Sequence, residues 1–193
     1  KFEITSLRND LSTDGRHAKV EFTSNWEQDA QRRDFTINAI YSDISGEVYD
    51  PLNGIEDLKN GIIKFIGDPN QRIQEDYLRI LRYLRFYTQY NKNKFHDEIA
   101  IKAIKRNLDG LAKISRERIL GELFKMMKLN NFSKLFEDEF CRFIILSILP
   151  QLRNYNRIKI LNKISYKIKK QIDKILLLSI LIFDETDNCN FFL

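Results

Sequence analysis

Residues 75–86 read EDYLRILRYLRF, and this stretch decides how the rest of the chain is interpreted. Its apolar residues recur at helical spacing, which predicts one buried helix face made of Ile73, Tyr77, Ile80, Leu81 and Leu84. Asp76 and Arg79 are three residues apart, so on this helix they are neighbours on the polar side. A carboxylate beside a guanidinium group presents an acceptor and two donors, as recognition of a nucleobase edge requires. An ordinary solvated face with salt bridges is the alternative at this point.

The overall composition is typical of a helical globular protein. The chain has 193 residues, enough for one large or two small domains. It has only seven glycines and three prolines, and this scarcity favours helices. The net charge of +5 permits a polyanionic partner without requiring one.

The cysteines and the hydropathy of the sequence indicate the compartment in which we expect the chain. Cys141 and Cys189 have neither metal-site nor disulfide spacing, so we expect reduced thiols in a cytoplasmic compartment. The longest apolar run, residues 175–183, has about half the length of a membrane span, so we expect no membrane-spanning segment. His17 and His96 stand without further ligand types nearby, so we expect no metal ligands in this chain.

Residues 1–69 contain short alternating patterns that are typical of strands. The expected strands are residues 1–8, 20–22, 39–44, 48–50 and 62–66. Residues 9–31 are polar, so we expect a mobile loop with a brief hairpin, anchored by Trp26; stacking of Trp26 on RNA is the alternative. Ser45-Gly46 predicts a two-residue hairpin turn, and Asp57 is expected to hold a second turn by accepting backbone N–H groups. Beyond residue 69 the sequence predicts only helices, among them residues 97–107, 115–128 and 131–149.

Residues 31–40, QRRDFTINAI, are a candidate phosphate-binding segment. Asp34 is predicted to cap a helix that turns its apolar residues inward. Arg33 would then stand at a helix N-terminus, where free backbone N–H groups favour phosphate, and its guanidinium could bind a triphosphate. The alternative is a surface ion pair of Arg33 with Asp29 or Asp34, which contributes about 0–1 kcal/mol.

Several stretches, in this order, resemble the successive motifs of one family. They are RRDFTINA at residues 32–39, DP at 50–51 with Gly54 and DL at 57–58, and EDxxRxxR at 75–82. The chain resembles the class II tRNA nucleotidyltransferases, the CCA-adding enzyme family that also contains bacterial poly(A) polymerases. Residues 14–23, with Asp14, Gly15 and Arg16, resemble the family's flexible loop and look closer to its eukaryotic and mitochondrial branch. The resemblance extends over residues 1–130 and fades beyond them.

The resemblance implies template-independent addition of CMP and AMP to tRNA 3′ ends, with CTP and ATP as substrates. In that family an Asp and an Arg act as a protein template, and this role falls to Asp76 and Arg79. The Asp would accept a hydrogen bond from the exocyclic amino group that C and A share, and each good base contact gives roughly 1–3 kcal/mol of discrimination. The residues that the resemblance places in nucleotide binding are Arg33, Asp76, Arg79, Arg82 and Arg85. Those that it places behind them as orienting residues are Asp34, Asn38 and Glu75.

The family's metal site, an Asp-x-Asp pair that binds Mg²⁺, has no counterpart in the right order in this sequence. Phosphoryl transfer needs such a two-metal site, so we expect its ligands upstream of Lys1. From residues 1–193 alone we therefore expect nucleotide recognition, no catalytic residue and no polymerising activity. A separate N-terminal fragment that completes the head is one expected partner.

Residues 153–175 predict a basic amphipathic helix. Its apolar residues keep helical spacing, and Lys and Arg side chains surround them against the single acid Asp173. We expect this helix to bind tRNA phosphates with Lys163, Lys167, Lys169 and Lys170. Contact with an anionic membrane surface, or with a helix that lies outside this chain, are the alternatives.

Together these features predict an α+β fold in three parts. Residues 1–69 are expected to form the C-terminal part of a nucleotidyltransferase head with a mixed sheet, and residues 70–130 a helical neck with the nucleotide-selecting helix. Residues 131–193 are expected to form a partial helical body that binds the tRNA. CCA addition is the predicted function, and poly(A) addition is the alternative enzyme activity. A non-catalytic RNA- or nucleotide-binding remnant, or a subunit of a split enzyme, is the alternative outside the enzymes.

Overall fold

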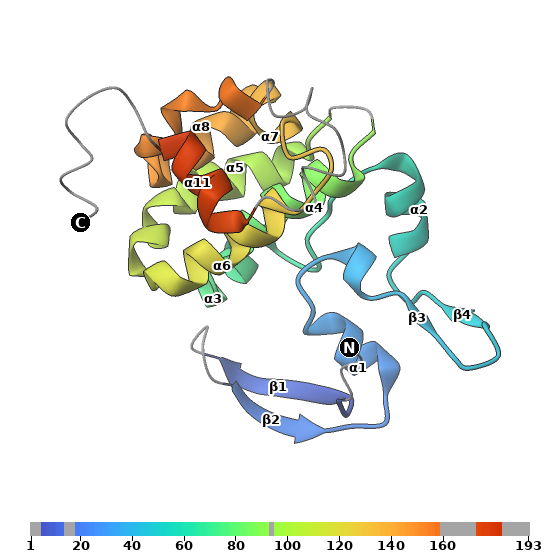
Figure 1. Cartoon of the computed structure of the whole chain (residues 1–193). Coiled ribbons are helices and arrows are strands. Elements are labelled where there is room, and N and C mark those ends of the chain that lie inside the picture. Colours follow the sequence, from blue (N-terminus) through green and yellow to red (C-terminus); the bar gives the residue numbers. More distant parts are fainter. Residues whose placement is uncertain (1–4, 14–17, 93–94, 159–172, 183–193) are drawn as a thin grey trace. The chain divides into compact units, whose positions relative to one another are not determined.

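The computed structural model describes residues 5–13, 18–92, 95–158 and 173–182, with the backbone alone at residues 10–13, 18–20, 153 and 174. The chain divides into two compact units, Lys1–Glu122 (unit 1) and Leu123–Leu193 (unit 2). Unit 1 combines two hairpins with helices, and the described part of unit 2 is helical (Figure 1). The predicted α+β class is confirmed. The described strands form two separate two-stranded antiparallel sheets instead of the one mixed sheet that we expected.

The first hairpin pairs β1 (Arg8–Thr13) with β2 (Ala18–Phe22) in antiparallel register. This confirms the brief hairpin expected within residues 9–31. The expected strand over residues 1–8 is wrong for residues 5–7, which precede β1, and its residues 1–4 lie outside the described part. Leu7 instead packs against the small core cluster of Ala30, Ala39, Tyr41 and Ile66. Partial burial of that one side chain, and not alternation along a strand, explains the apolar residue there.

Helix α1 (Trp26–Gln31) occupies a place where we expected loop. The Asn25 side chain caps it by accepting hydrogen bonds from the backbone N–H groups of Glu27 and Gln28. At six residues it is too short to give a periodic signal in the sequence. Trp26 packs edge-on against Tyr41, with ring centroids 4.7 Å apart, which fits the anchoring role predicted for it.

The predicted helix after Asp34 is wrong. Phe35 is extended, with φ −128° and ψ 148°, and only the 3-10 turn η1 (Thr36–Asn38) follows it. The reason is a long-range pairing: Phe35 bridges Phe65, and the Thr36 N–H donates to the carbonyl of Lys64 at 3.1 Å. The strand expected over residues 62–66 is likewise reduced to this isolated bridge.

The second hairpin, β3 (Tyr41–Ser42) with β4 (Val48–Tyr49), confirms the predicted strand pair, although both strands are shorter than the predicted residues 39–44 and 48–50. Its turn is longer than the two residues predicted. The Asp43 carboxylate accepts hydrogen bonds from the N–H groups of Ser45 and Glu47, and Gly46 takes φ +88°. Gly46 therefore supplies the left-handed conformation that closes this turn.

Helix α2 (Gly54–Asn60) follows, and the carboxylate that holds the turn before it differs from the predicted one. Asp50 accepts the N–H groups of Gly54 and Ile55, both at 2.8 Å. Asp57 instead accepts the hydroxyl of Thr36 at 2.7 Å. The two carboxylates are seven residues apart, and no local pattern distinguishes Asp50 from Asp57.

The helix predicted around residues 75–86 is two helices, α3 (Pro69–Glu75) and α4 (Arg79–Tyr90). Asp76 between them is extended, with φ −155° and ψ 102°. Its side chain accepts the N–H of Leu78 at 3.1 Å and its carbonyl accepts the N–H of Arg79 at 3.0 Å, so a local turn replaces the helical ladder. The predicted apolar face is otherwise confirmed, because its aliphatic members are buried and only Tyr77 is half-exposed.

The core of unit 1 is aromatic where α4 meets the segment around Phe35. The Phe35 ring lies 4.7 Å from that of Phe65 and 5.4 Å from that of Phe86, measured between centroids. Helices α5 (Glu98–Asn107) and α6 (Arg116–Met127), joined by η2 (Leu108–Lys113), confirm the two helices predicted there. The boundary between the units falls within α6.

The described part of unit 2 contains α7 (Lys134–Glu137), α8 (Glu139–Ile148), η3 (Pro150–Asn154) and α11 (Lys174–Ile182). Asp138 separates α7 from α8 and caps α8, so the single helix predicted over residues 131–149 is wrong there. Burial raises the pKa of the Cys141 thiol well above its usual value. The cytoplasmic location predicted from the cysteines stays a prediction. None of the described helices is long and apolar enough to cross a membrane.

Candidate functional site

Unit 1 contains a cleft of about 450 Å³ built mainly from charged side chains. Its lining residues are Arg8, Arg32, Arg33, Asp34, Asn38, Asp76, Leu78, Arg79, Arg82, Phe86 and Arg118. Six guanidinium groups face two carboxylates, so the cleft carries a positive charge. Such a cleft fits an anionic ligand, and guanidinium groups bind phosphate with charge-assisted hydrogen bonds.

Asp76 lines the cleft from the extended segment between α3 and α4. One carboxylate oxygen, Oδ1, accepts the N–H of Leu78, and the other, Oδ2, lies 2.8 Å from Nη2 of Arg118 on α6. A carboxylate has about four acceptor positions, so Asp76 keeps capacity for a donor on a ligand. The prediction that Asp76 and Arg79 lie together is met at the cleft, although no single helix carries both.

Arg79 is held from behind by the end of α3. Its Nη1 donates to the carbonyl of Arg72 at 2.6 Å and to the carboxylate of Glu75. Glu75 shares the same oxygen with Arg72, whose Nη1 lies 2.8 Å away. Glu75 does not line the cleft, and it contacts Arg79 instead of Asp76. This geometry suits the orienting role predicted for Glu75.

Asp34, Asn38 and Arg82 form a second group on the cleft wall. Burial acts to raise the pKa of the Asp34 carboxyl, but the charge and hydrogen bond of Arg82 outweigh it and hold that pKa below its ordinary value. The amide of Asn38 donates to Asp34 at 2.7 Å. Asp34 and Asn38, predicted to stand behind the ligand-binding residues, therefore line the cleft themselves.

The placement predicted for Arg33 at a helix N-terminus is wrong, because Arg33 follows the C-terminal end of α1. Its Nε and Nη2 lie 3.0 and 2.8 Å from Oδ2 of Asp29, so the alternative ion pair exists. Asp29 is fully buried, however, and it also binds Arg32 and the Tyr41 hydroxyl. Burial acts to raise the pKa of Asp29, but its hydrogen bonds to Arg32, Arg33 and Tyr41 outweigh burial and bring the pKa to about 2.

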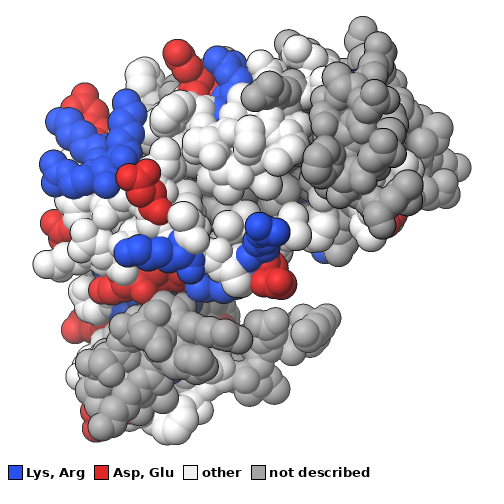
Figure 2. All heavy atoms as spheres, turned by 90° about the vertical axis from the view of Figure 1, so that its left-hand side faces the viewer, with Lys and Arg blue, Asp and Glu red and all other residues white. Residues whose placement is uncertain are grey.

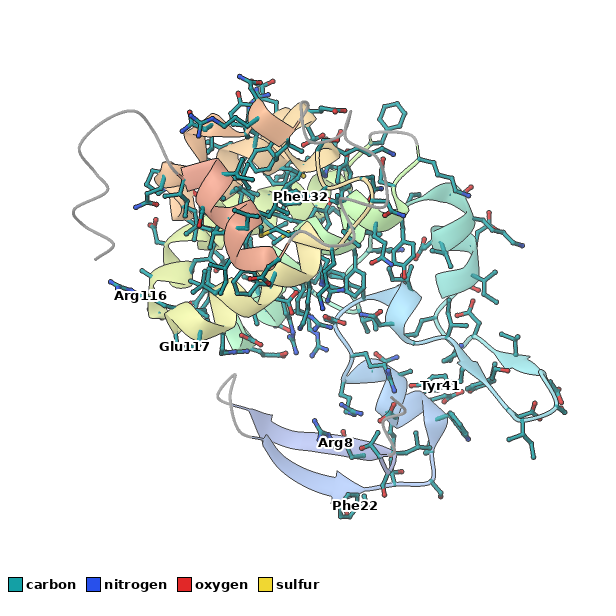
Figure 3. The ribbon with its side chains drawn as sticks, viewed as in Figure 1. Arg8, Phe22, Tyr41, Arg116, Glu117 and Phe132 are labelled. Carbon is teal, nitrogen blue, oxygen red and sulfur yellow. The ribbon has the colours of Figure 1, made fainter. Side chains whose placement is uncertain are left out.

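The Asp29 cluster, made of Asp29, Arg32, Arg33 and Tyr41, also holds the start of the first hairpin. The backbone N–H of Arg8 donates to Asp29 at 3.3 Å, and the Arg8 carbonyl accepts from Nε of Arg32 at 3.0 Å. Arg8 lies on β1 and Tyr41 on β3 (Figure 3). The Asp29 carboxylate therefore joins segments from both hairpins and α1. The cluster thus fixes the position of three cleft arginines.

Arg85 does not line the cleft. Its Nε pairs with Glu122 of α6 at 2.8 Å, and the two side chains are only 13% and 2% exposed. The guanidinium also lies 4.2 Å from the centroid of the Phe86 ring. The nucleotide-binding role predicted for Arg85 is therefore not supported by its position, because its guanidinium is not part of the cleft lining.

Sequence reasoning missed three cleft arginines, Arg8, Arg32 and Arg118. Arg32 stands beside Arg33 and could have been found as a pair, whereas Arg8 and Arg118 carry no local signal. Several predicted residues lie outside the described part of the chain: Asp14, Gly15, Arg16, Lys163, Lys167, Lys169 and Lys170.

The described cleft residues do not fit a magnesium site. Mg²⁺ prefers carboxylate oxygens that can complete an octahedral shell. Asp34 and Asp76, the cleft's described carboxylates, are each paired with an arginine, which opposes a second cation there. These residues therefore do not support a metal-dependent step.

Two family models match separate parts of the chain. The Poly A polymerase head domain matches residues 1–64, and the model described as "Probable RNA and SrmB- binding site of polymerase A" matches residues 97–154. The human CCA tRNA nucleotidyltransferase 1, mitochondrial, is 53% identical over 135 residues, which are 69% of this chain and 31% of that protein. The chain belongs to the CCA-adding enzyme and poly(A) polymerase family.

Other members of the family agree with this assignment. The CCA-adding enzyme of Lactobacillus helveticus is 45% identical over 127 residues, 65% of this chain and 31% of that protein. The crystal structure of the Bacillus stearothermophilus CCA-adding enzyme in complex with CTP has 34% identity and a TM-score of 0.57, over 67% of this chain and 31% of that chain. This chain thus spans about a third of the length of the curated relatives that it matches.

Proposed function

We propose that the chain is the nucleotide-recognising part of a tRNA nucleotidyltransferase that adds CMP and AMP to tRNA 3′ ends. The observation that carries this proposal is the meeting of Asp76 and Arg79 in a cleft whose other charges are mostly guanidinium groups. The names of the relatives, CCA tRNA nucleotidyltransferase and CCA-adding enzyme, support this activity over poly(A) addition.

The cleft divides the work of recognition between its charges. Arg33 and Arg82 line it and would contact the triphosphate and ribose of CTP or ATP. Asp76 would accept the exocyclic amino group that C and A share, and Arg79 would donate to the acceptors of the base ring. G and U lack an amino group at that position, so each such contact gives roughly 1–3 kcal/mol against them.

The three parts of the chain fit a division of labour. We assign residues 1–69 to the head, 70–130 to the neck and 131–193 to the body. The head-domain match over residues 1–64 and the RNA-binding match over residues 97–154 support this division.

The described cleft carboxylates are paired with arginines, so the Mg²⁺ that supplies charge neutralisation in phosphoryl transfer would be held by other residues. The acceptor of the transferred nucleotide would be tRNA.

Nucleotide binding by the 193-residue chain tests the base-selecting pair. In calorimetric titrations we expect CTP and ATP to bind about tenfold or more tightly than UTP and GTP. Asp76→Ala should remove this preference while leaving the affinity for tripolyphosphate unchanged, because the arginines remain. Asp109→Ala, at an exposed carboxylate outside the cleft lining, is the control. An equal loss of affinity for all four nucleotides in Asp76→Ala would overturn the assignment.

A further inference from the structure

The ring of Tyr77 rests directly on the backbone of Gly110 in η2. A Cβ atom at Gly110 would lie 2.0 Å from both Cδ1 and Cε1 of Tyr77 and 2.5 Å from its Cγ. Side-chain carbons do not approach so closely, so any residue with a Cβ would displace the ring. The φ of Gly110 is not positive, so its backbone does not itself require glycine. The contact with Tyr77 is what requires a residue without a side chain here.

Tyr77 belongs to the joint, residues 76–78, which connects α3 and α4. Because Asp76 is extended, no helical ladder fixes its orientation. The segment 110–118 holds the joint instead. Gly110 supports the Tyr77 ring, Lys113 Nζ lies 5.5 Å from the centroid of that ring, and Arg118 pairs with the Asp76 carboxylate.

We propose that Gly110 and Tyr77 form a seat that sets the position of Asp76 in the cleft, which makes both of them positioning residues for base selection. This inference rests on the proposed function, in which Asp76 reads the base. Tyr77 is the chain neighbour of Asp76, so a shift of its ring moves the peptide that carries the Asp76 carboxylate. Neither Gly110 nor Tyr77 lines the cleft, so any effect they have on the base is indirect, and the joint is the route that we infer.

Gly110→Ala tests the seat, because the added methyl group forces the Tyr77 ring to move. We expect the amide signals of Leu78 and Arg79, whose N–H groups donate to Asp76, to shift in ¹H–¹⁵N spectra of the whole chain. The preference for CTP over UTP should fall roughly tenfold, whereas the affinity for tripolyphosphate should stay at the wild-type value. Gly121→Ala is the matched control, since a Cβ there meets nothing within 4 Å.

A double-mutant cycle shows whether the effect passes through the ring. In a Tyr77→Ala background the methyl group meets no ring, so Gly110→Ala should change neither the amide signals nor the nucleotide preference further. Tyr77→Phe keeps the ring and should behave as wild type. If Gly110→Ala does not fold, Tyr77→Leu replaces it as the test, and the same two amide signals should shift.

The outcomes separate this inference from the proposed function. Unshifted Leu78 and Arg79 signals in Gly110→Ala, or an equal effect of Gly110→Ala with and without the Tyr77 ring, would overturn the seat while base selection by Asp76 stands. A wild-type chain that does not prefer CTP over UTP would overturn the proposed function. In that case the shifted amide signals would still establish the seat.

Discussion

Asp29 holds two arginines of the cleft in place although it does not itself line the cleft. Its carboxylate is fully buried and accepts hydrogen bonds from Arg32, Arg33 and the hydroxyl of Tyr41. Both arginines line the cleft, yet Asp29 does not. An unpaired buried carboxylate would be costly, so these partners stabilise its charge, and Asp29 in turn fixes the two guanidinium groups.

At the residue scale we predict that Asp29→Asn destabilises the chain by about 3–5 kcal/mol, because it removes a buried charge and leaves two arginines without their carboxylate. Urea unfolding measures this loss. Asp109→Asn, at an exposed position, should change the free energy of unfolding little. A loss in Asp29→Asn no larger than that of the control would contradict the role given to Asp29.

We also predict that Asp29→Asn changes how the free energy of unfolding depends on pH in acid. The pKa of Asp29 falls from 3.8 to about 2 on folding, so its contribution to stability is fully present above pH 3.8. That contribution is lost as the pH falls from about 4 towards 2. The difference in unfolding free energy between the wild type and Asp29→Asn should therefore shrink over this pH range, and a constant difference would be contrary evidence.

At the scale of elements, α2 and η1 approach so closely that a glycine is needed between them. A Cβ at Gly54 would lie 2.3 Å from the carbonyl oxygen of Thr36. The hydrogen bond of the Thr36 hydroxyl to Asp57 comes from the same pair of elements. This contact joins the segment after the cleft residues Arg33 and Asp34 to α2.

Gly54→Ala should destabilise the chain by about 1–3 kcal/mol, because the new methyl group meets backbone atoms that cannot rotate away. Thermal or urea unfolding gives the value. Gly121→Ala makes the same chemical change inside a helix with open space around it, and it should be neutral or stabilising. Equal free energies of unfolding for the two variants would contradict this prediction, because they would show that η1 can move to accommodate the methyl group.

At the scale of the whole molecule, the charged side chains that give the net charge of +5 are unevenly distributed. On the face drawn in Figure 2, Lys and Arg side chains are interspersed with Asp and Glu. The cleft of unit 1 concentrates guanidinium groups, whereas the lysine-rich run of residues 159–170 lies outside the described residues. Its tRNA-binding role stays a prediction.

Changing Lys167, Lys169 and Lys170 together to Ala should weaken tRNA binding and flatten the plot of log affinity against log salt concentration by roughly two to three units, as the loss of three phosphate contacts requires. Filter binding at several salt concentrations measures the slope. Changing the exposed Lys59, Lys64 and Lys92 to Ala removes the same charge and should leave the slope nearly unchanged. Equal slopes for the two triple variants would remove residues 167–170 from the RNA surface.

The sequence alone determined what depends on neighbours along the chain. Apolar spacing predicted the buried face of α4, turn residues predicted the second hairpin, and ordered motifs brought Asp76 and Arg79 to attention. Helical periodicity and turn chemistry act over a few residues, so they can be read locally.

Only the tertiary structure decided which charged side chains line the cleft. Asp76 leaves the helix and pairs with Arg118, 42 residues away, while Arg85 is taken by Glu122, 37 residues away. The bridge between Phe35 and Phe65 likewise replaced the helix predicted after Asp34. An arginine has the same local signal whether it faces a cleft or a buried carboxylate, because its partner is set by packing between distant segments and not by its neighbours in sequence.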